Sequence, residues 1–235
     1  MAVPIRRARR RSFVSRLLRA VMVLAITFYG IVILSLVAFR WVNPITTALQ
    51  IERRVQALIG HTAYKKSYVF VPLREISPNL QHAVIAAEDA RFYQHHGFDW
   101  KQVQIAIEED QERGRRRGAS TITQQLVKNL FLGTSRSFIY NGIRKGIEFT
   151  IVPLTEGLLS KQRILELYLN VIEWGPGTYG AEAASVHYYG VPAKRITREE
   201  AVELATVLPA PLRRKPGRMT EYGSRILERM AQMQW

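Results

Sequence analysis

SPNLQHAVIAAEDARFYQHHGFDW, residues 77–100, predicts both a helical fold and the place of a reactive site. Ser77 can cap a helix, and Pro78 suits the first helical position because the N–H that proline lacks would be unpaired there anyway. Apolar residues then recur at the spacing of one helix face, namely Leu80, Val84 and Ala87. The stretch therefore predicts an apolar helix that ends at the acidic pair Glu88 and Asp89.

The ionisable side chains at this helix end allow a metal site, an acid/base site or an ordinary polar terminus. His95 and His96 are adjacent, so on a helix they would point about 100° apart and make poor metal co-ligands. The chain also has no H-E-x-x-H motif. Partial burial would instead raise the pKa of Glu88 toward that of a general base, with Asp89 and Arg91 close enough to orient it. The plain alternative is a solvated helix end that carries a salt bridge.

Helix-start signals recur along the rest of the chain. Residues able to cap a helix precede apolar runs, and two of them have the form of a capping box: Asp99, Thr121 with Gln124, Ser160, and Thr197 with Glu200. Strand-like alternation is nearly absent, and SYVFV at 67–71 is the best candidate. GPGTYG, 175–180, fits G-x-G-x-x-G, but a helical pattern precedes it where a dinucleotide fold needs a strand, so we expect a glycine-rich loop. The chain thus predicts one mainly α-helical domain.

The N-terminal region predicts a membrane anchor. Residues 1–19 hold seven arginines and no acid, and residues 20–39 carry no charge. Twenty helical residues extend about 30 Å, the thickness of a bilayer hydrocarbon core. The alternative, a signal peptide, has a shorter apolar run and a cleavage site that is not found here. We expect 1–19 to be a basic cytoplasmic tail, 20–39 a single helix across the cytoplasmic (inner) membrane, 40–64 a juxtamembrane connector and 65–235 a periplasmic domain.

The cysteine content and the net charge of the chain limit the kinds of reaction and partner to be expected. The 235-residue chain has no cysteine, which excludes thiolate catalysis and cysteine-ligated metals. Its net charge is +15, and subtracting the seven N-terminal arginines leaves +8. This excess favours an anionic partner. Because the predicted topology places the domain outside the cytoplasm, we expect phospholipid or a pyrophosphate substrate rather than nucleic acid.

Two further stretches place polar and basic side chains on helices. GASTITQQLVKN, 118–129, crowds groups at a helix start that could bind a phosphate or sugar hydroxyls, namely Ser120, Gln124, Gln125 and Lys128. In RSFIYNGIRKGIE, which begins at Arg136, Arg144 and Glu148 share a helix face and Lys145 is adjacent. These cations could neutralise a diphosphate that Glu148 positions. The alternatives are a well-capped surface helix and a surface ion pair.

A series of motifs along the chain closely resembles those of the peptidoglycan glycosyltransferases, in the same order: EDARFYQHHGFD, GASTITQQLVKN, RKGIE, ILELYLN and GPGTYGAEAASVHYYG. The resemblance covers residues from about 65 to 215. It implies a lysozyme-like, mainly α-helical domain that polymerises lipid II into β-1,4-linked glycan, with inversion at the anomeric carbon and release of undecaprenyl pyrophosphate. Because the chain contains no transpeptidase motif, it looks like the monofunctional biosynthetic form.

The resemblance also implies roles for individual residues. Glu88 matches the base that deprotonates the 4-hydroxyl of the acceptor N-acetylglucosamine. Glu148 matches a second glutamate that assists pyrophosphate departure, directly or through a divalent cation, Mg2+ or Mn2+; no other cofactor and no fixed metal ligands are implied. Some relatives carry lysine just before this glutamate, where the chain has Ile147. The expected substrate-binding residues are Asp89, Arg91, Phe92, Ser120, Gln124, Gln125, Lys128, Arg136, Arg144 and Lys145.

The expected partners are lipid II, the growing lipid-linked glycan and the membrane, with other cell-wall synthesis or division proteins left open. The apolar segments LFL, 130–132, and FIY, 138–140, are expected to dip into the membrane, with ordinary core packing as the alternative. Two other functions stay open: a lytic glycosidase with Glu88 as general acid, and a non-catalytic, membrane-anchored glycan-binding scaffold. The basic residues around Arg144 argue against the lytic enzyme, because glycan cleavage requires no phosphate clamp.

Overall fold

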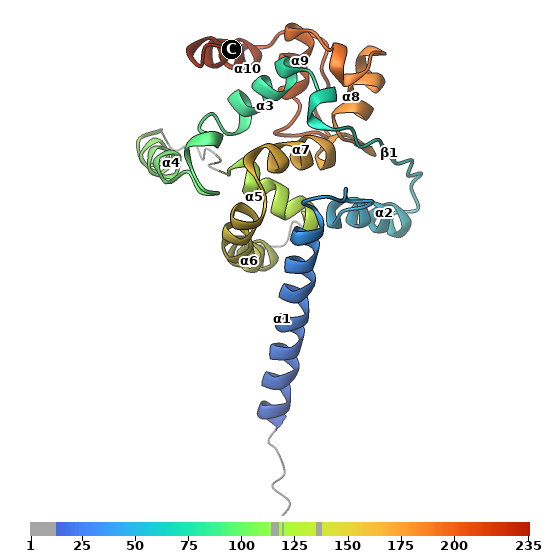
Figure 1. Cartoon of the computed structure of the whole chain (residues 1–235), viewed down its shortest axis with the longest axis vertical. Helices are drawn as coiled ribbons and strands as arrows, with labels where there is room; N and C mark the ends of the chain where they lie inside the picture. Colours follow the sequence, from blue (N-terminus) through green and yellow to red (C-terminus); the bar gives the residue numbers. More distant parts are fainter. Residues whose placement is uncertain (1–12, 114–117, 119, 135–137) are drawn as a thin grey trace, which may run out of the picture.

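The computed structural model describes residues 13–113, 118, 120–134 and 138–235. Within these ranges the chain forms ten α-helices, a few short 3-10 and π turns, and one small three-stranded sheet. Figure 1 shows a helical domain with the first helix, α1, projecting from one end and α9 and α10 at the other. The expected mainly α fold with an N-terminal apolar helix is therefore confirmed.

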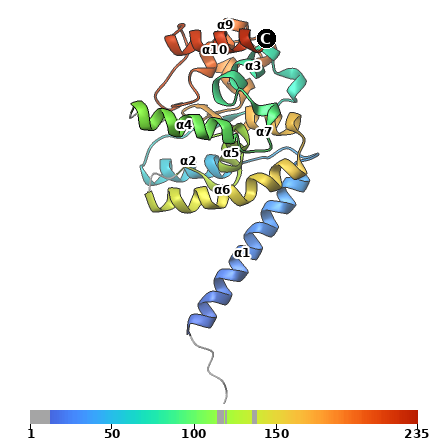
Figure 2. The same cartoon turned by 90° about the vertical axis from the view of Figure 1, so that its left-hand side faces the viewer.

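Helix α1, Phe13–Ala38, is the helix in the described part of the chain that is long and apolar enough to cross a membrane. Most of its apolar side chains are exposed, and it leaves the domain as a stalk (Figure 2). Only its last turns pack on the domain, where Val32 and Leu36 are buried. There the hydroxyls of Tyr29 and Thr150 lie 2.5 Å apart. The domain is thus fixed directly to the end of the anchor.

Helix α2, Ala48–Ile59, ties the connector to the domain at two points. Arg53 Nε donates to Glu173 Oε2 at 2.9 Å, an ion pair that is largely buried. Glu52 accepts a hydrogen bond from the backbone N–H of Thr134, in the loop that follows the π turn η3, Lys128–Leu132. The connector is therefore an integral part of the fold.

The core forms around two sets of packed helices. Helix α3, Pro78–Glu88, packs on α9, Arg198–Ala205, and α10, Glu221–Gln232. Helix α5, Ile122–Val127, packs on α6, Phe138–Leu158, and α7, Lys161–Val171. The other elements are α4, Trp100–Arg113, α8, Ala181–Tyr189, and the 3-10 turns η1, Leu73–Glu75, η2, Phe92–Gln94, and η4, Ala193–Arg195.

The predicted helix starts are confirmed. Ser77, Thr121, Ser160 and Thr197 each accept a backbone N–H at the start of their helix, and both capping boxes form. Asp99 Oδ1 accepts the N–H of Gln102 at 3.1 Å at the start of α4. These bonds satisfy first-turn N–H groups that have no partner within the helix.

The sheet corrects the prediction for GPGTYG. Strand β1, Ser67–Tyr68, pairs in parallel with β3, Thr178–Tyr179, which pairs antiparallel with β2, Glu173–Gly175. The segment is a tight hairpin rather than a loop, with strands too short and too buried for an alternating pattern. At Gly177 φ is +72°, and a Cβ there would collide with the carbonyl oxygen of Lys65. Helix α7 precedes this hairpin, in agreement with rejection of the dinucleotide fold.

Replacement of the fully buried Leu80 tests the packing of α3 on α9 and α10. We expect Leu80→Ala to lower the free energy of unfolding by about 2–5 kcal/mol, because the side chain leaves a cavity in the core. Leu58→Ala in α2 is the matched control, since Leu58 is 68% exposed. Urea unfolding of detergent-solubilised protein, followed by circular dichroism, measures both. Equal losses would contradict the described packing.

Candidate active site

Glu88 is the last residue of α3, and a hydrogen-bonded chain fixes the position of its carboxylate. Gln125 Nε2 donates to Glu88 Oε2 at 2.7 Å, and Tyr168 Oη donates to Gln125 Oε1 at 2.9 Å. Because the tyrosine donates to the amide oxygen, the amide must turn its NH2 group toward Glu88. Tyr168 lies on α7 and Gln125 on α5, so three helices define the position of one carboxylate.

The surroundings of Glu88 suit a proton acceptor. Burial raises the pKa of Glu88, and the negative charge of Asp89 raises it further. The hydrogen bond from Gln125 and the positive charge of Lys128 oppose this effect, but the pKa remains above its usual value. A carboxyl with a raised pKa is a stronger base once ionised, which is the property that general base catalysis needs.

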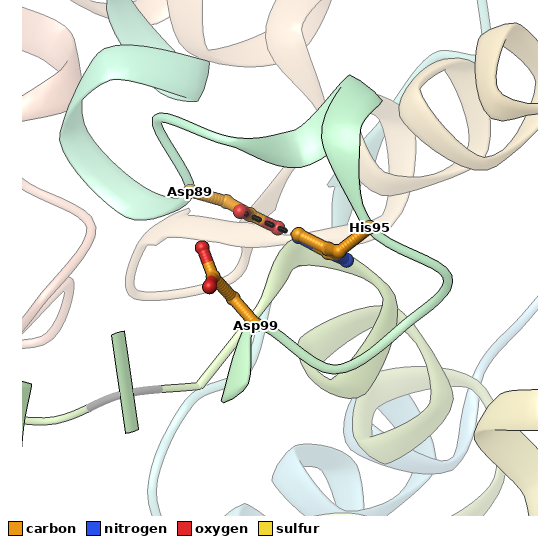
Figure 3. A group of neighbouring side chains, drawn as sticks. All are labelled: Asp89, His95 and Asp99. Carbon is orange, nitrogen blue, oxygen red and sulfur yellow. Dashed lines mark hydrogen bonds and ion pairs between the residues drawn. The ribbon is translucent and has the colours of Figure 1, made fainter. Parts of the chain in front are cut away.

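Asp89 holds the neighbouring elements together. Its Oδ1 lies 2.9 Å from His95 Nε2, and its Oδ2 accepts the N–H of Ile122, the first residue of α5, at 3.0 Å. Figure 3 shows the Asp89 carboxylate pointing at the His95 ring. Nδ1 of His95 accepts the N–H of Gly97 at 3.1 Å, so the ring proton is on Nε2 and is donated to Asp89.

Asp89, His95 and Asp99 offer ligand atoms within 4.8 Å of one another, the arrangement a cation site would have among the described residues (Figure 3). These ligand atoms do not fit a cation, because nearly all of them already make hydrogen bonds within the protein. Both ring nitrogens of His95 and both oxygens of Asp89 are hydrogen-bonded, and Asp99 Oδ1 accepts from Arg91 and Gln102. Only Asp99 Oδ2 is without a partner in the described part of the chain. His95 is thus a hydrogen-bond partner of Asp89.

A cationic cluster surrounds the second glutamate. Glu148 in α6 is buried; Arg144 donates to its Oε1, and Lys145 Nζ lies 2.9 Å from its Oε2. Lys145 also reaches Ser120 Oγ at 3.3 Å, and the Nε of Arg144 is buried without a hydrogen-bond partner among the described residues. Because both oxygens of Glu148 are engaged by cations, this carboxylate also offers no ready place for Mg2+ or Mn2+.

The positive charge of Lys128 acts on both carboxylates, those of Glu88 and Glu148. Burial lowers the pKa of Lys128, as does the charge of Arg144, whereas Glu148 and Glu88 each raise the pKa of this lysine. One ammonium group therefore interacts with both glutamates. Arg144 and Lys145 pair with the buried Glu148, and the charge of Lys128 also acts on this glutamate, so the three cations exceed its single negative charge. The remaining positive charge suits a bound diphosphate. We call these three residues with Glu148 the basic cluster.

Several residues expected in the cleft have other places. Phe92 is fully buried in the core, with the Lys161 ammonium 4.5 Å from its ring centroid, so its prediction as a substrate contact is wrong. Gln124 is held in the capping box of α5. Arg91 donates to Asp99 at 2.9 Å and is a partner of that buried acid. Arg136 lies outside the described residues.

A pocket of about 490 Å³ adjoins Glu88 and includes residues that sequence reasoning missed. One part of its wall comes from the C-terminal region, with Pro209, Arg214, Tyr222, Arg225 and Arg229. Arg225 and Arg229 are four residues apart and share a face of α10, a spacing visible in the sequence. Their approach to Glu88 depends on the packing of α10 on α3, which no local pattern indicates.

A desolvated carboxyl beside a cationic cluster, on a helical scaffold, is the arrangement of an acid/base transferase that handles an anionic donor. The chain belongs to the transglycosylase family: the model of that family, described as Transglycosylase, matches residues 54–233.

Curated relatives carry the name biosynthetic peptidoglycan transglycosylase. The chain is 45% identical to the relative from Pseudomonas putida strain F1 over 193 residues, which cover 82% of this chain and 80% of the relative. It is 41% identical to the one from Pseudomonas entomophila over 211 residues, 90% and 86% of the two chains. A relative from Laribacter hongkongensis is 44% identical over 177 residues, 75% and 76% of the two chains.

Replacement of Gln125 tests the hydrogen bond to Glu88. Gln125→Met keeps the length of the side chain but removes the donor that stabilises the ionised carboxylate, so we expect the pKa of Glu88 to rise further. Carbon-13 NMR of the glutamate side-chain carboxyls, with Glu88→Gln for assignment, measures the titration. Gln104→Met on the exposed face of α4 should leave it unchanged. A downward shift in Gln125→Met would show that the bond does not favour the charged form.

Proposed function

We propose that the protein polymerises lipid II into β-1,4-linked glycan strands, with inversion at the anomeric carbon and release of undecaprenyl pyrophosphate. Membership of the transglycosylase family and the names of the curated relatives support this proposal. The observation that carries it is the position of Lys145, which pairs with Glu148 and also donates to Ser120 in the wall of the pocket beside Glu88. This contact joins a proton acceptor to a cationic cluster that suits a diphosphate.

In the proposed reaction, the ionised Glu88 carboxylate takes the proton of the acceptor 4-hydroxyl. The acceptor oxygen forms a bond to the anomeric carbon of the donor, and the bond from that carbon to the pyrophosphate oxygen breaks. The leaving pyrophosphate keeps the electron pair. A single displacement of this kind inverts the anomeric carbon, because attack and departure occur on opposite faces.

The basic cluster would stabilise the charge that develops on the leaving pyrophosphate. Lys128, Arg144 and Lys145 supply the cations, and Glu148 fixes the last two by accepting their hydrogen bonds. We infer that Glu148 is a positioning residue for these cations. At the position where some relatives carry lysine, this chain has the uncharged Ile147, which is partly buried against the core. This position therefore adds no charge to the basic cluster.

We propose that α1 crosses the cytoplasmic membrane with its N-terminus inside and the domain in the periplasm, with the predicted boundaries at 19, 39 and 64. Leu130 is buried in the core, so the core alternative holds for it; Phe131 lies beside Phe39 at the end of α1, with ring centroids 6.4 Å apart. The exposed apolar side chains of α6 include Ile143, 61% exposed. Helix α6 lies against the end of α1, so this face would meet the lipid (Figure 2).

The test is incubation of detergent-solubilised protein with labelled lipid II, with and without moenomycin, followed by separation of products by size. A moenomycin-sensitive ladder of glycan that muramidase digests supports the polymerase. Shortening of preformed glycan without any polymer would favour the lytic glycosidase. If lipid II is bound but not converted, the non-catalytic, glycan-binding scaffold would be the function that remains.

Replacement of Glu88 is expected to increase stability. Since the pKa of Glu88 is raised by folding, its carboxyl stabilises the fold when protonated, and this contribution is lost as the pH rises through the folded-state pKa. At neutral pH, Glu88→Gln should therefore raise the melting temperature; the gain should shrink as the pH falls through the folded-state pKa and be absent below the unfolded-state pKa. Thermal unfolding at several pH values measures this. Glu228→Gln, at an exposed position, is the control; a destabilised Glu88→Gln would refute the desolvated environment of Glu88.

Replacement of Lys128 separates the two roles of its charge. Lys128→Met should lower kcat/KM by about tenfold to a hundredfold, because one charge-assisted contact to the leaving group is lost. Part of any loss at low pH comes from Glu88, because the charge of Lys128 lowers the pKa of this base. The rate is therefore measured up to a pH at which Glu88 is fully ionised. The loss should persist at that pH. If the rate of Lys128→Met instead recovered to that of the exposed control Lys101→Met, Lys128 would not stabilise the leaving group.

A further inference from the structure

Three arginines line the pocket beside Glu88 on its C-terminal wall. Arg225 and Arg229 come from one face of α10, and Arg214 comes from the segment that precedes this helix. Tyr222 lies among them, with the Arg214 guanidinium 5.8 Å from its ring centroid. We call these four residues the arginine wall.

The positive charges of the arginine wall are only weakly compensated by other groups of the protein. Arg214 donates to the carbonyl oxygen of Thr206 at 3.0 Å, and Arg229 donates to that of Ala86 at 3.1 Å. A neutral carbonyl does not compensate a guanidinium charge. Arg225 pairs with Glu221 at 3.3 Å, but the two side chains are 57% and 86% exposed, so this pair contributes little.

The arginine wall also has only a small effect on the pKa of Glu88. Arg214 lowers the pKa of Glu88 less than Gln125 and Lys128 do. A second pocket shares Arg214 and Tyr222 and adds Lys215 and Arg218, so the basic surface continues past the first pocket. These side chains form an accessible cationic wall next to the reaction centre.

The arginine wall and the basic cluster lie at different heights above the anchor. Helix α10 is at the end of the domain far from α1, whereas α6, which carries Arg144 and Lys145, lies against α1 (Figures 1 and 2). The diphosphate of lipid II is joined to its lipid and must stay near the membrane. The basic cluster is at the height where that diphosphate can bind, and the arginine wall is farther out.

We propose that the arginine wall binds a carboxylate of the peptide carried by the N-acetylmuramic acid of the substrate. This subsite rests on the proposed function. Apart from the diphosphate, the only anionic groups of lipid II are the carboxylates of its peptide, and the peptide is free of the membrane. Guanidinium groups bind carboxylates through paired hydrogen bonds, and the adjoining pocket has room for a chain segment.

The experiment compares lipid II that has free peptide carboxylates with lipid II in which they are converted to carboxamides. Steady-state polymerisation is measured for wild type, for Arg225→Gln, and for Arg214→Gln combined with Arg225→Gln. Arg213→Gln is the matched control, because Arg213 is exposed and lies outside both pockets. Arg229 is kept, since it bonds to the end of α3 next to Glu88.

For wild type we expect the carboxamide substrate to have a KM about threefold to tenfold higher, with kcat little changed. The double variant should show this higher KM with both substrates, so that the preference disappears, and Arg213→Gln should keep it. Equal KM values for the two substrates in wild type would overturn the subsite while leaving the polymerase intact. An equal loss with both substrates in the double variant, with the preference retained, would also overturn it. Absence of any polymer from wild type would overturn the proposed function, and the subsite with it.

Discussion

The carboxylate of Asp89 is the constraint on which the rest of the site depends. One oxygen accepts from His95 and the other from the first N–H of α5, so a single buried side chain joins the end of α3 to the start of α5. Gln125 stands one turn into α5 and bonds to Glu88 because these two helix ends are fixed together. Removal of a buried acceptor of this kind costs about 1–3 kcal/mol for each donor left unpaired. The position of the Glu88 carboxyl thus depends on the hydrogen bonds of its neighbour in sequence.

The two glutamates have different electrostatic surroundings, which suit them to different roles. Burial raises the pKa of Glu88 and suits it to accept a proton, whereas Glu148 is covered by Arg144 and Lys145 and orients them. Burial lowers the pKa of Lys128, and the charges of Arg144 and Lys145 lower it further, a strain that comes from collecting several cations in one buried place. A diphosphate would relieve that strain, so binding of the donor and stabilisation of the leaving group draw on the same charges. The short range of these interactions requires α3, α5 and α6 to be held as one unit.

The sequence predicted the features that depend on local order along the chain. The helix starts at Ser77, Thr121 and Ser160 were predictable because a capping residue and its helix are neighbours in sequence. The arginine wall was not, because it arises from the packing of α10 on α3, whose residues are more than a hundred positions apart. Phe92 was misplaced for a related reason: an aromatic residue next to a site can face the cleft or the core, and only tertiary packing decides which.

We propose that Glu88 is the base of a lipid II polymerase. The most direct measurement is single-turnover glycan formation by Glu88→Gln beside wild type, with binding of labelled lipid II measured on the same preparations. We expect that binding is retained while the rate of glycan formation falls by about a hundredfold to ten-thousandfold, the usual contribution of a positioned base. Glycan formation at the wild-type rate by a variant that binds lipid II normally would contradict it.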